Sequence, residues 1–304
     1  MMHWRGRKFG VMLAFSGFLV QLTSGQDLPA DFGTAQGTER LAASAGFIDV
    51  LDIKLGMPAE SALARLKANN PTSKITFSRA RDYETTWRNN SLAEDPKRKW
   101  VLQIDVEPSG GVGDRIAVGL SLPPGKQVVD GVSRSTFFKD PVAVQNIVAG
   151  LRKKYGQETV GPGFRFGTMP LFDGADKIFI WIFDSQGNRM NSDVVAKRTD
   201  GCAVGLSMGT VDNTIRTSDW RAYGRDRLKN NPCEAYVILT ARILALNAPP
   251  GINGMATSLE VVAFDWPLFN SSVTALYGFL DQRARELKNK EIQDANKRGG
   301  DVKY

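Results

Sequence analysis

Two helix patterns, each followed by a series of strand-like runs, place the strongest constraint on how this chain of 304 residues can fold. The first helix is expected at Pro58–Asn69, where a proline suits the first helical turn. The second is expected at Pro141–Tyr155, with Asp140 as its N-cap and Pro141 at its first position. Apolar residues recur through the second helix at the spacing of one helical face, namely Val144, Ile147, Val148, Leu151 and Tyr155.

Strand-like runs follow both helices. After the first come Lys74–Arg79, Lys99–Glu107 and Arg115–Leu122. After the second come Phe164–Thr168, Lys177–Asp184, Cys202–Met208, Ala235–Leu246 and Ser258–Asp265. The run Lys177–Asp184, KIFIWIFD, is apolar at both odd and even positions, which predicts a central strand that is covered on both faces.

This order of elements predicts an α+β fold with two halves, each a helix on an antiparallel meander, at residues 46–130 and 131–304. A long helix is expected to close the second half, at about residues 268–297. Its predicted packing face consists of Val273, Leu276, Tyr277, Leu280, Ala284 and Leu287.

The first 25 residues have the layout of a secretory signal peptide. Arg5, Arg7 and Lys8 precede the apolar run Phe9–Leu22, and small residues follow it. That run is shorter than the ~20 residues of a membrane span. We therefore expect a mature chain without a transmembrane segment, exported to the periplasm or beyond the cell, with residues 26–45 as a linker. The alternative is a retained N-terminal anchor.

Export would remove the single histidine of the chain, His3. The pattern GLSMG around Ser207 is then a poor candidate for a serine-hydrolase nucleophile, because the usual base is missing and no helix start follows. Without histidine the common zinc and copper ligand sets are missing too. We expect no metal and no cofactor.

The two cysteines, Cys202 and Cys233, are expected to form a disulfide, since exported proteins meet an oxidising environment. Closing a loop of about 31 residues would stabilise the fold by roughly 3.7 kcal/mol. A redox role is not indicated, because the spacing differs from C-x-x-C.

The segment between the cysteines contains the candidate binding residues. It mixes aromatic and cationic side chains, the types that dominate interface hot spots: Arg216, Trp220, Arg221, Tyr223 and Arg225. The alternative is a charged surface loop that binds nothing. The formal net charge of +7 falls to +4 once the three leader cations leave, which is too little to indicate a nucleic-acid partner.

Alternating carboxylates supply the one candidate for catalysis. In VLQIDVE, Val101, Gln103, Asp105 and Glu107 fall on one face of a strand, and two carboxylates there could serve as acid and base of a glycosidase. The alternative is a solvated strand face with the intervening residues turned inward. In FDSQGNRMNSD the calcium-loop pattern is incomplete, so Asp184–Asn188 is predicted to be a turn.

The sequence IKLGMPAESALARL, Ile53–Leu66, resembles the helix start of the SmpA/OmlA family of BamE-like proteins and is similar to β-lactamase-inhibitor-like modules. The resemblance implies an exported α+β module that binds other proteins and catalyses nothing. With the basic segment between the cysteines, the expected partner is an envelope protein or an anionic envelope component. The lipid-bearing cysteine of that family is absent, and the chain is longer than one such module. The alternative function is a histidine-free hydrolase of envelope polysaccharide that uses Asp105 and Glu107.

Overall fold

The computed structural model describes residues 46–86, 91–108, 113–122, 125–162, 165–166, 169–170, 176–191, 236–246 and 252–300. The helices are α1 (Ala59–Asn69), α2 (Val144–Tyr155) and α7 (Trp266–Gly300). The strands are β1 (Asp49–Val50), β2 (Ile53–Lys54), β3 (Lys74–Thr86), β4 (Ser91–Glu107), β5 (Asp114–Leu120), β6 (Val129–Ala143), β7 (Arg165–Phe166), β8 (Met169–Pro170), β9 (Asp176–Asp184), β10 (Tyr236–Leu246) and β11 (Met255–Asp265).

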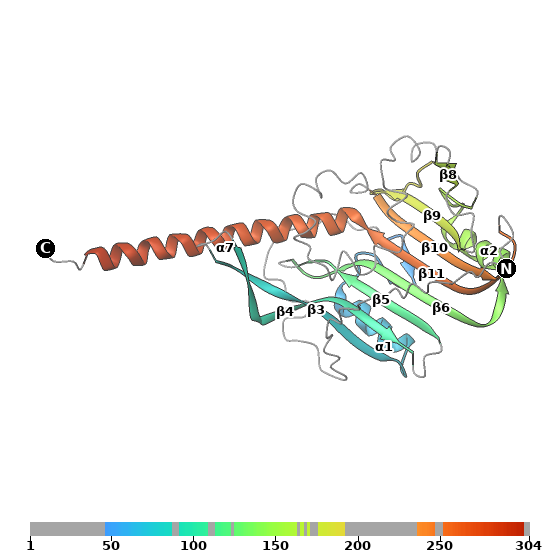
Figure 1. Cartoon of the computed structure of the whole chain (residues 1–304), viewed down its shortest axis with the longest axis horizontal. Coiled ribbons are helices and arrows are strands. Elements are labelled where there is room, and N and C mark those ends of the chain that lie inside the picture. The colour runs from blue at the N-terminus through green and yellow to red at the C-terminus, as the bar shows by residue number, and fades with distance from the viewer. Residues whose placement is uncertain are drawn as a thin grey trace, which may run out of the picture.

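One antiparallel sheet of seven strands, in the order β3-β4-β5-β6-β11-β10-β9, runs through the molecule (Figure 1). The predicted α+β class is confirmed, with a helix and a meander in each half and a long C-terminal helix. The last strand of each half, β6 and β11, pair with each other and join the halves into one sheet. Strand β6 crosses the boundary expected after residue 130.

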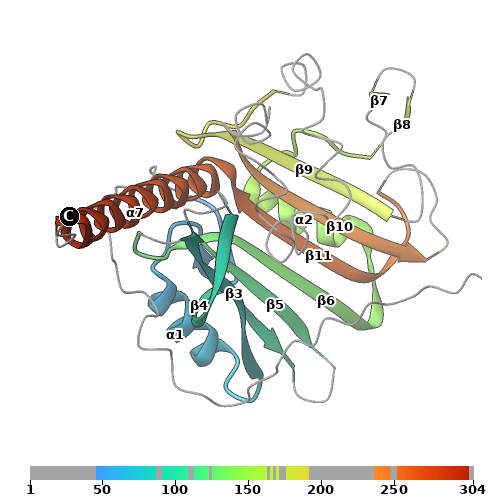
Figure 2. The ribbon, with the colours of Figure 1, turned by 60° about the vertical axis from the view of Figure 1, so that its left-hand side comes forward.

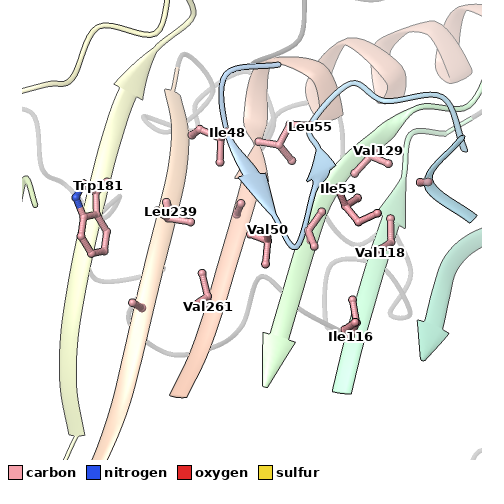
Figure 3. Packing of buried hydrophobic residues seen from close by; sticks show 14 of the residues in the cluster. Ile48, Val50, Ile53, Leu55, Ile116, Val118, Val129, Trp181, Leu239 and Val261 are labelled. Carbon is pink, nitrogen blue, oxygen red and sulfur yellow. The ribbon is translucent and has the colours of Figure 1, made fainter. Parts of the chain in front are cut away.

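One face of the sheet, here called the core face, carries the main hydrophobic core. Residues directly opposite each other in neighbouring strands share a face. The row Ile104, Val118, Val132, Ala263, Leu239 and Trp181 therefore crosses all the strands from β4 to β9 on this face. Helices α1 and α2 pack here, and Figure 2 shows α2 behind β10 and β11. Figure 3 shows the β1–β2 hairpin over the central strands with its apolar side chains turned toward them.

The start of α2 differs from the prediction. Asp140 and Pro141 belong to β6, and the helix begins at Val144 with Ala143 at the cap and no capping side chain. The cause is pairing at long range, because Val142 and Ala143 lie opposite Ala256 and Met255 of β11. The predicted apolar stripe is confirmed, since Val144, Val148 and Leu151 are buried.

The position of β9 also differs from the prediction. Both of its faces are buried, as expected, but the strand lies at the edge of the sheet instead of its centre. Residues 159 and 160, just after α2, close that edge through two backbone N–H groups that donate to the carbonyl of Ile180. An edge that is covered in this way can have the all-apolar sequence of an inner strand.

Helix α7 is 35 residues long, and only its first turns belong to the body. Asp265 accepts a hydrogen bond from the backbone N–H of Leu268, which caps the helix start. The large apolar side chains that it buries are Trp266, Leu268, Phe269, Val273 and Leu276. The predicted packing face is wrong at its far end, since Leu287 is 38% exposed there, and the helix extends past the sheet (Figure 1).

Candidate functional site

The residues that the sequence put forward for binding lie outside the described residues. These are Arg216, Trp220, Arg221, Tyr223 and Arg225, and the cysteines Cys202 and Cys233 lie outside them as well. Their roles remain predictions.

The carboxylates Asp105 and Glu107 lie on the face of the sheet opposite the core face, here called the outer face. The two oxygens of Asp105 accept hydrogen bonds from Ser78 Oγ at 3.0 Å and from Gln103 Nε2 at 2.5 Å. Glu107 is exposed at the end of the strand. A carboxylate whose oxygens are both engaged by neighbouring strand residues is suited to holding β3 against β4.

The prediction for β4 is wrong at Val101, which was expected on the face of Asp105. Val101 is buried in the core with Ile104 and Val106. The register of β3 against β4 slips by one residue between Ser78 and Arg79, so that Leu102 is inserted. A bulge of this kind reverses the alternation of the strand beyond it.

The segment after β9 forms the predicted turn. Asp184 accepts hydrogen bonds from the backbone N–H groups of Gln186 and Asn188 and from the Asn188 side chain. These contacts hold the pKa of Asp184 below its ordinary value, the side-chain hydrogen bond from Asn188 contributing most. The carboxylate is therefore the acceptor that orders this turn.

The outer face of the sheet has a covered end and an open end. At the covered end, the first turns of α7 pack on Phe264, whose ring lies 4.9 Å from that of Trp266 and 5.5 Å from that of Phe269. Ile238 lies opposite Phe264 in the register and is buried with it. The open end lies around the turn from β10 to β11, at the far end of both strands from α7.

Four large apolar side chains are exposed at the open end of the outer face. They are Phe137 (57% exposed), Leu244 (43%), Leu246 (51%) and Met255 (45%), here called the apolar patch. Leu246 lies opposite Met255, while Phe137 and Leu244 flank Ser258 from the two neighbouring strands. The register therefore places all four on one surface across β6, β11 and β10.

A row of polar and charged residues borders the apolar patch toward the middle of the sheet. Arg242, Glu260, Ser135 and Arg115 follow one another across β10, β11, β6 and β5 on the outer face. Arg242 and Arg115 are exposed. An apolar centre beside a charged margin is the usual composition of a protein–protein interface.

On the core side, polar contacts fasten α2 to its neighbours. Lys154 Nζ lies 2.7 Å from Asp49 Oδ1, and the hydroxyl of Tyr155 donates to the carbonyl of Asp49. Arg152 binds both oxygens of Glu158 at 2.5 and 2.8 Å. Each contact joins α2 to an adjacent segment, which is a structural role.

The ion pair between Arg152 and Glu158 can be tested through the pH dependence of stability. Burial by itself raises the pKa of Glu158, but the hydrogen bonds and positive charge of Arg152 outweigh it, so the pKa lies below its ordinary value of 4.5. The lowered pKa adds stability above pH 4.5 that is lost as the pH falls through the folded-state value. We expect Glu158→Gln to lower the free energy of unfolding by about 1–2 kcal/mol at pH 7, because Arg152 is partly exposed.

Urea unfolding at pH 7 and at pH 3 measures this effect. The difference between the wild type and Glu158→Gln should shrink toward pH 3, because the stability that the lowered pKa of Glu158 adds decreases as the pH falls below 4.5. Glu107→Gln is the matched control, since Glu107 is an exposed carboxylate. An equal loss of stability at both pH values would contradict the proposed ion pair.

The described part of the chain contains no group of three or more His, Cys, Asp and Glu residues arranged to hold a metal ion. Within the same ranges, no helix combines the length and the apolar character needed to cross a bilayer. Comparisons of the chain with protein-family models, with curated proteins and with solved structures found no match.

The apolar patch was not predicted from the sequence. In ARILAL of β10, the core face takes Ala241, Ile243 and Ala245 and the outer face takes Leu244 and Leu246. The outer face also takes Arg242, and local sequence does not show whether the two leucines beside it are covered. How much of the outer face stays open depends on where α7 packs, and that contact is made by residues more than twenty positions away.

Proposed function

We propose that this protein is an exported, non-enzymatic binding module that docks another envelope protein through the apolar patch. The observation that carries the proposal is the exposure of four large apolar side chains beside one another on the outer face of the sheet. Contiguous exposed apolar surface of this kind marks interaction sites. The expected leader peptide and the resemblance to BamE-like modules support the same conclusion.

The choice of a protein partner follows from the chemistry of the surface. Leucine, methionine and phenylalanine side chains contribute to binding affinity when they are buried at an interface. Their burial needs an apolar surface on the partner. The bordering residues Arg242 and Glu260 carry opposite charges and lie opposite each other in the register. A polyanion would meet a carboxylate there as well as a cation, so the surface fits a protein with mixed charges better.

The carboxylate-dependent hydrolase is not proposed here. Asp105 is fixed by Ser78 and Gln103, as described above, and this geometry favours a structural role. The basic and aromatic segment around Arg221 remains a predicted second contact of the same partner.

The test is the double substitution Phe137→Ser with Leu246→Ser. Both side chains are half exposed, so the free energy of unfolding should change by less than about 1 kcal/mol. If the patch is the centre of the interface, the loss of two apolar anchors should weaken binding by about 30-fold or more. The partner is first identified by cross-linking in the native envelope, and its affinity for purified wild type and variant is then measured by calorimetry.

Lys54→Ser with Lys67→Ser is the matched control, since both lysines are exposed and lie on the core side of the sheet. Its affinity should equal that of the wild type. Equal affinity of the patch variant would place the interface elsewhere. The same preparation tests export, which predicts an intact mass lacking residues 1–25 and no free thiol.

A further inference from the structure

At the centre of the apolar patch, two large side chains flank a small one. Ser258 of β11 lies opposite Phe137 of β6 on one side and opposite Leu244 of β10 on the other. The two flanking side chains are exposed, whereas Ser258 is half-buried. Neighbouring strands lie about 4.8 Å apart, so the backbones that carry Phe137 and Leu244 are about 10 Å apart. The short serine side chain leaves the middle of this span to a side chain from another molecule.

The pairing of β6 with β11 is interrupted beside this serine. Ser258 and Ala256 of β11 lie opposite Phe137 and Val142 of β6, so the four residues 138–141 stand where β11 has one. Bulges are common next to active sites, where they change the direction of a neighbouring side chain. The interruption of a strand in the middle of the sheet is a second reason, independent of the apolar exposure, to regard the surface around Ser258 as a binding surface.

A helix covers the other end of the same outer face. The rings of Trp266 and Phe269 in α7 lie 4.9 and 5.5 Å from that of Phe264 in β11. Figures 1 and 2 show α7 continuing from the end of β11 and running out past the sheet. The apolar patch is thus the exposed continuation of a face on which a helix already packs through large apolar side chains.

The dimensions of the apolar patch also fit one helix. A helix with its side chains is about 10–12 Å wide, close to the two interstrand spacings from β6 to β10. Leu244 and Leu246 are about 6.8 Å apart along β10, and side chains four positions apart on a helix are about 6 Å apart along its axis. A helix along β11 can therefore place one side chain over Ser258 and the next over the opposed pair Leu246 and Met255.

A second copy of this chain fits the same position poorly. A two-fold contact centred on the apolar patch brings Ser258 of one copy against Ser258 of the other, because such a contact uses the same surface on both molecules. A small side chain would then face a small side chain, and the space between Phe137 and Leu244 would stay unfilled in both copies. Unfilled space in an apolar interface forfeits the van der Waals contacts that give it affinity.

We infer that the apolar patch binds an amphipathic helix of the partner protein, which inserts one large aliphatic or aromatic side chain over Ser258, between Phe137 and Leu244. A second apolar side chain, three or four positions away on that helix, packs on Leu246 and Met255. Helices that dock on a surface in this way use apolar residues at this spacing. The inference rests on the proposed function and names the element that the patch recognises.

Substitutions at Ser258 test the insertion, with the cross-linked partner protein purified and its affinity measured by calorimetry. Ser258→Phe and Ser258→Leu enlarge the apolar surface but occupy the position of the inserted side chain, so binding should weaken by at least about tenfold. Ser258→Ala keeps that position free and should bind within about twofold of the wild type. A flat apolar contact predicts the opposite, because the larger side chains would leave the affinity unchanged or raise it.

Ser61→Phe is the matched control, since Ser61 is exposed on α1, on the core side of the sheet. It makes the same chemical change away from the patch and should leave the affinity unchanged. Circular dichroism and urea unfolding of each variant exclude a loss of the fold as the cause. If Phe137→Ser, Leu246→Ser weakens binding but Ser258→Phe and Ser258→Leu do not, the insertion is wrong and the proposed function stands. If none of them weakens binding, both are wrong.

Photo-cross-linking from position 137 tests the helical form of the partner segment. Phe137 is replaced by p-benzoylphenylalanine in the full-length chain, and the captured segment is located by mass spectrometry. Alanine substitutions along that segment should weaken binding most, by at least about tenfold, at two positions three or four residues apart. The largest losses at alternate positions would indicate a strand, and capture of a second copy of this chain or of a lipid would indicate another occupant. Each of these results overturns the inference.

Discussion

Trp181→Ala is expected to lower the free energy of unfolding by about 3–5 kcal/mol, one of the largest effects of any single substitution in this chain. Trp181 is fully buried on the core face, with its ring centroid 5.9 Å from that of Tyr155 and 6.4 Å from that of Phe179. Its indole N–H also donates to Gly156, which joins the end of α2 to the edge strand. Removing it leaves a cavity where the sheet meets α2.

The measurement is urea unfolding followed by far-ultraviolet circular dichroism, which does not rely on the substituted chromophore. Trp181→Phe is the matched control, because it keeps an aromatic ring and loses the hydrogen bond to Gly156. It should cost about 1–2 kcal/mol. A loss below 1 kcal/mol in Trp181→Ala, with an unchanged denaturant slope, would show that this side chain is not packed as described.

Trp181 also shows which part of the fold the sequence could predict. The apolar run around it indicated burial on both faces, and burial is a property that local composition encodes. The order of strands in the sheet is decided by contacts between distant segments. The coverage of the β9 edge by residues 159 and 160 is such a contact, and local composition does not predict it. The run Lys177–Asp184 therefore resembles a central strand, although it forms an edge strand.

The same distinction explains the start of α2. Asp140 and Pro141 form a favourable helix start on local grounds. Pairing of β6 with β11 extends the strand to Ala143 and outweighs the capping preference, which contributes only about 1 kcal/mol. The helical stripe beyond Val144 was predicted correctly because its periodicity is local and continuous.

For the candidate site, the sequence could point to residue types but not to surfaces. Arg216 and its neighbours stand out by their chemistry, whereas the apolar patch depends on how much of the outer face of β10 and β11 is left uncovered by α7.

Deletion of residues 266–304 is expected to prevent folding, whereas deletion of 286–304 should leave stability unchanged within about 0.5 kcal/mol. The longer deletion removes five large buried apolar side chains, Trp266, Leu268, Phe269, Val273 and Leu276, and exposes Phe264 and Ile238 of the sheet. At about 1.5–3 kcal/mol for each buried side chain, the loss is roughly 8–15 kcal/mol. That equals the whole stability of a typical domain.

The shorter deletion removes a part of α7 in which every described side chain is exposed. Thermal unfolding by circular dichroism compares both truncations with the full chain, and Leu268→Ala, Val273→Ala in the full chain reports on packing without truncation. A folded protein after the longer deletion would show that the outer face does not need α7. A large loss after the shorter one would show that the far half of the helix packs against the body, so the two deletions together show whether the contribution of α7 to the core ends before residue 286.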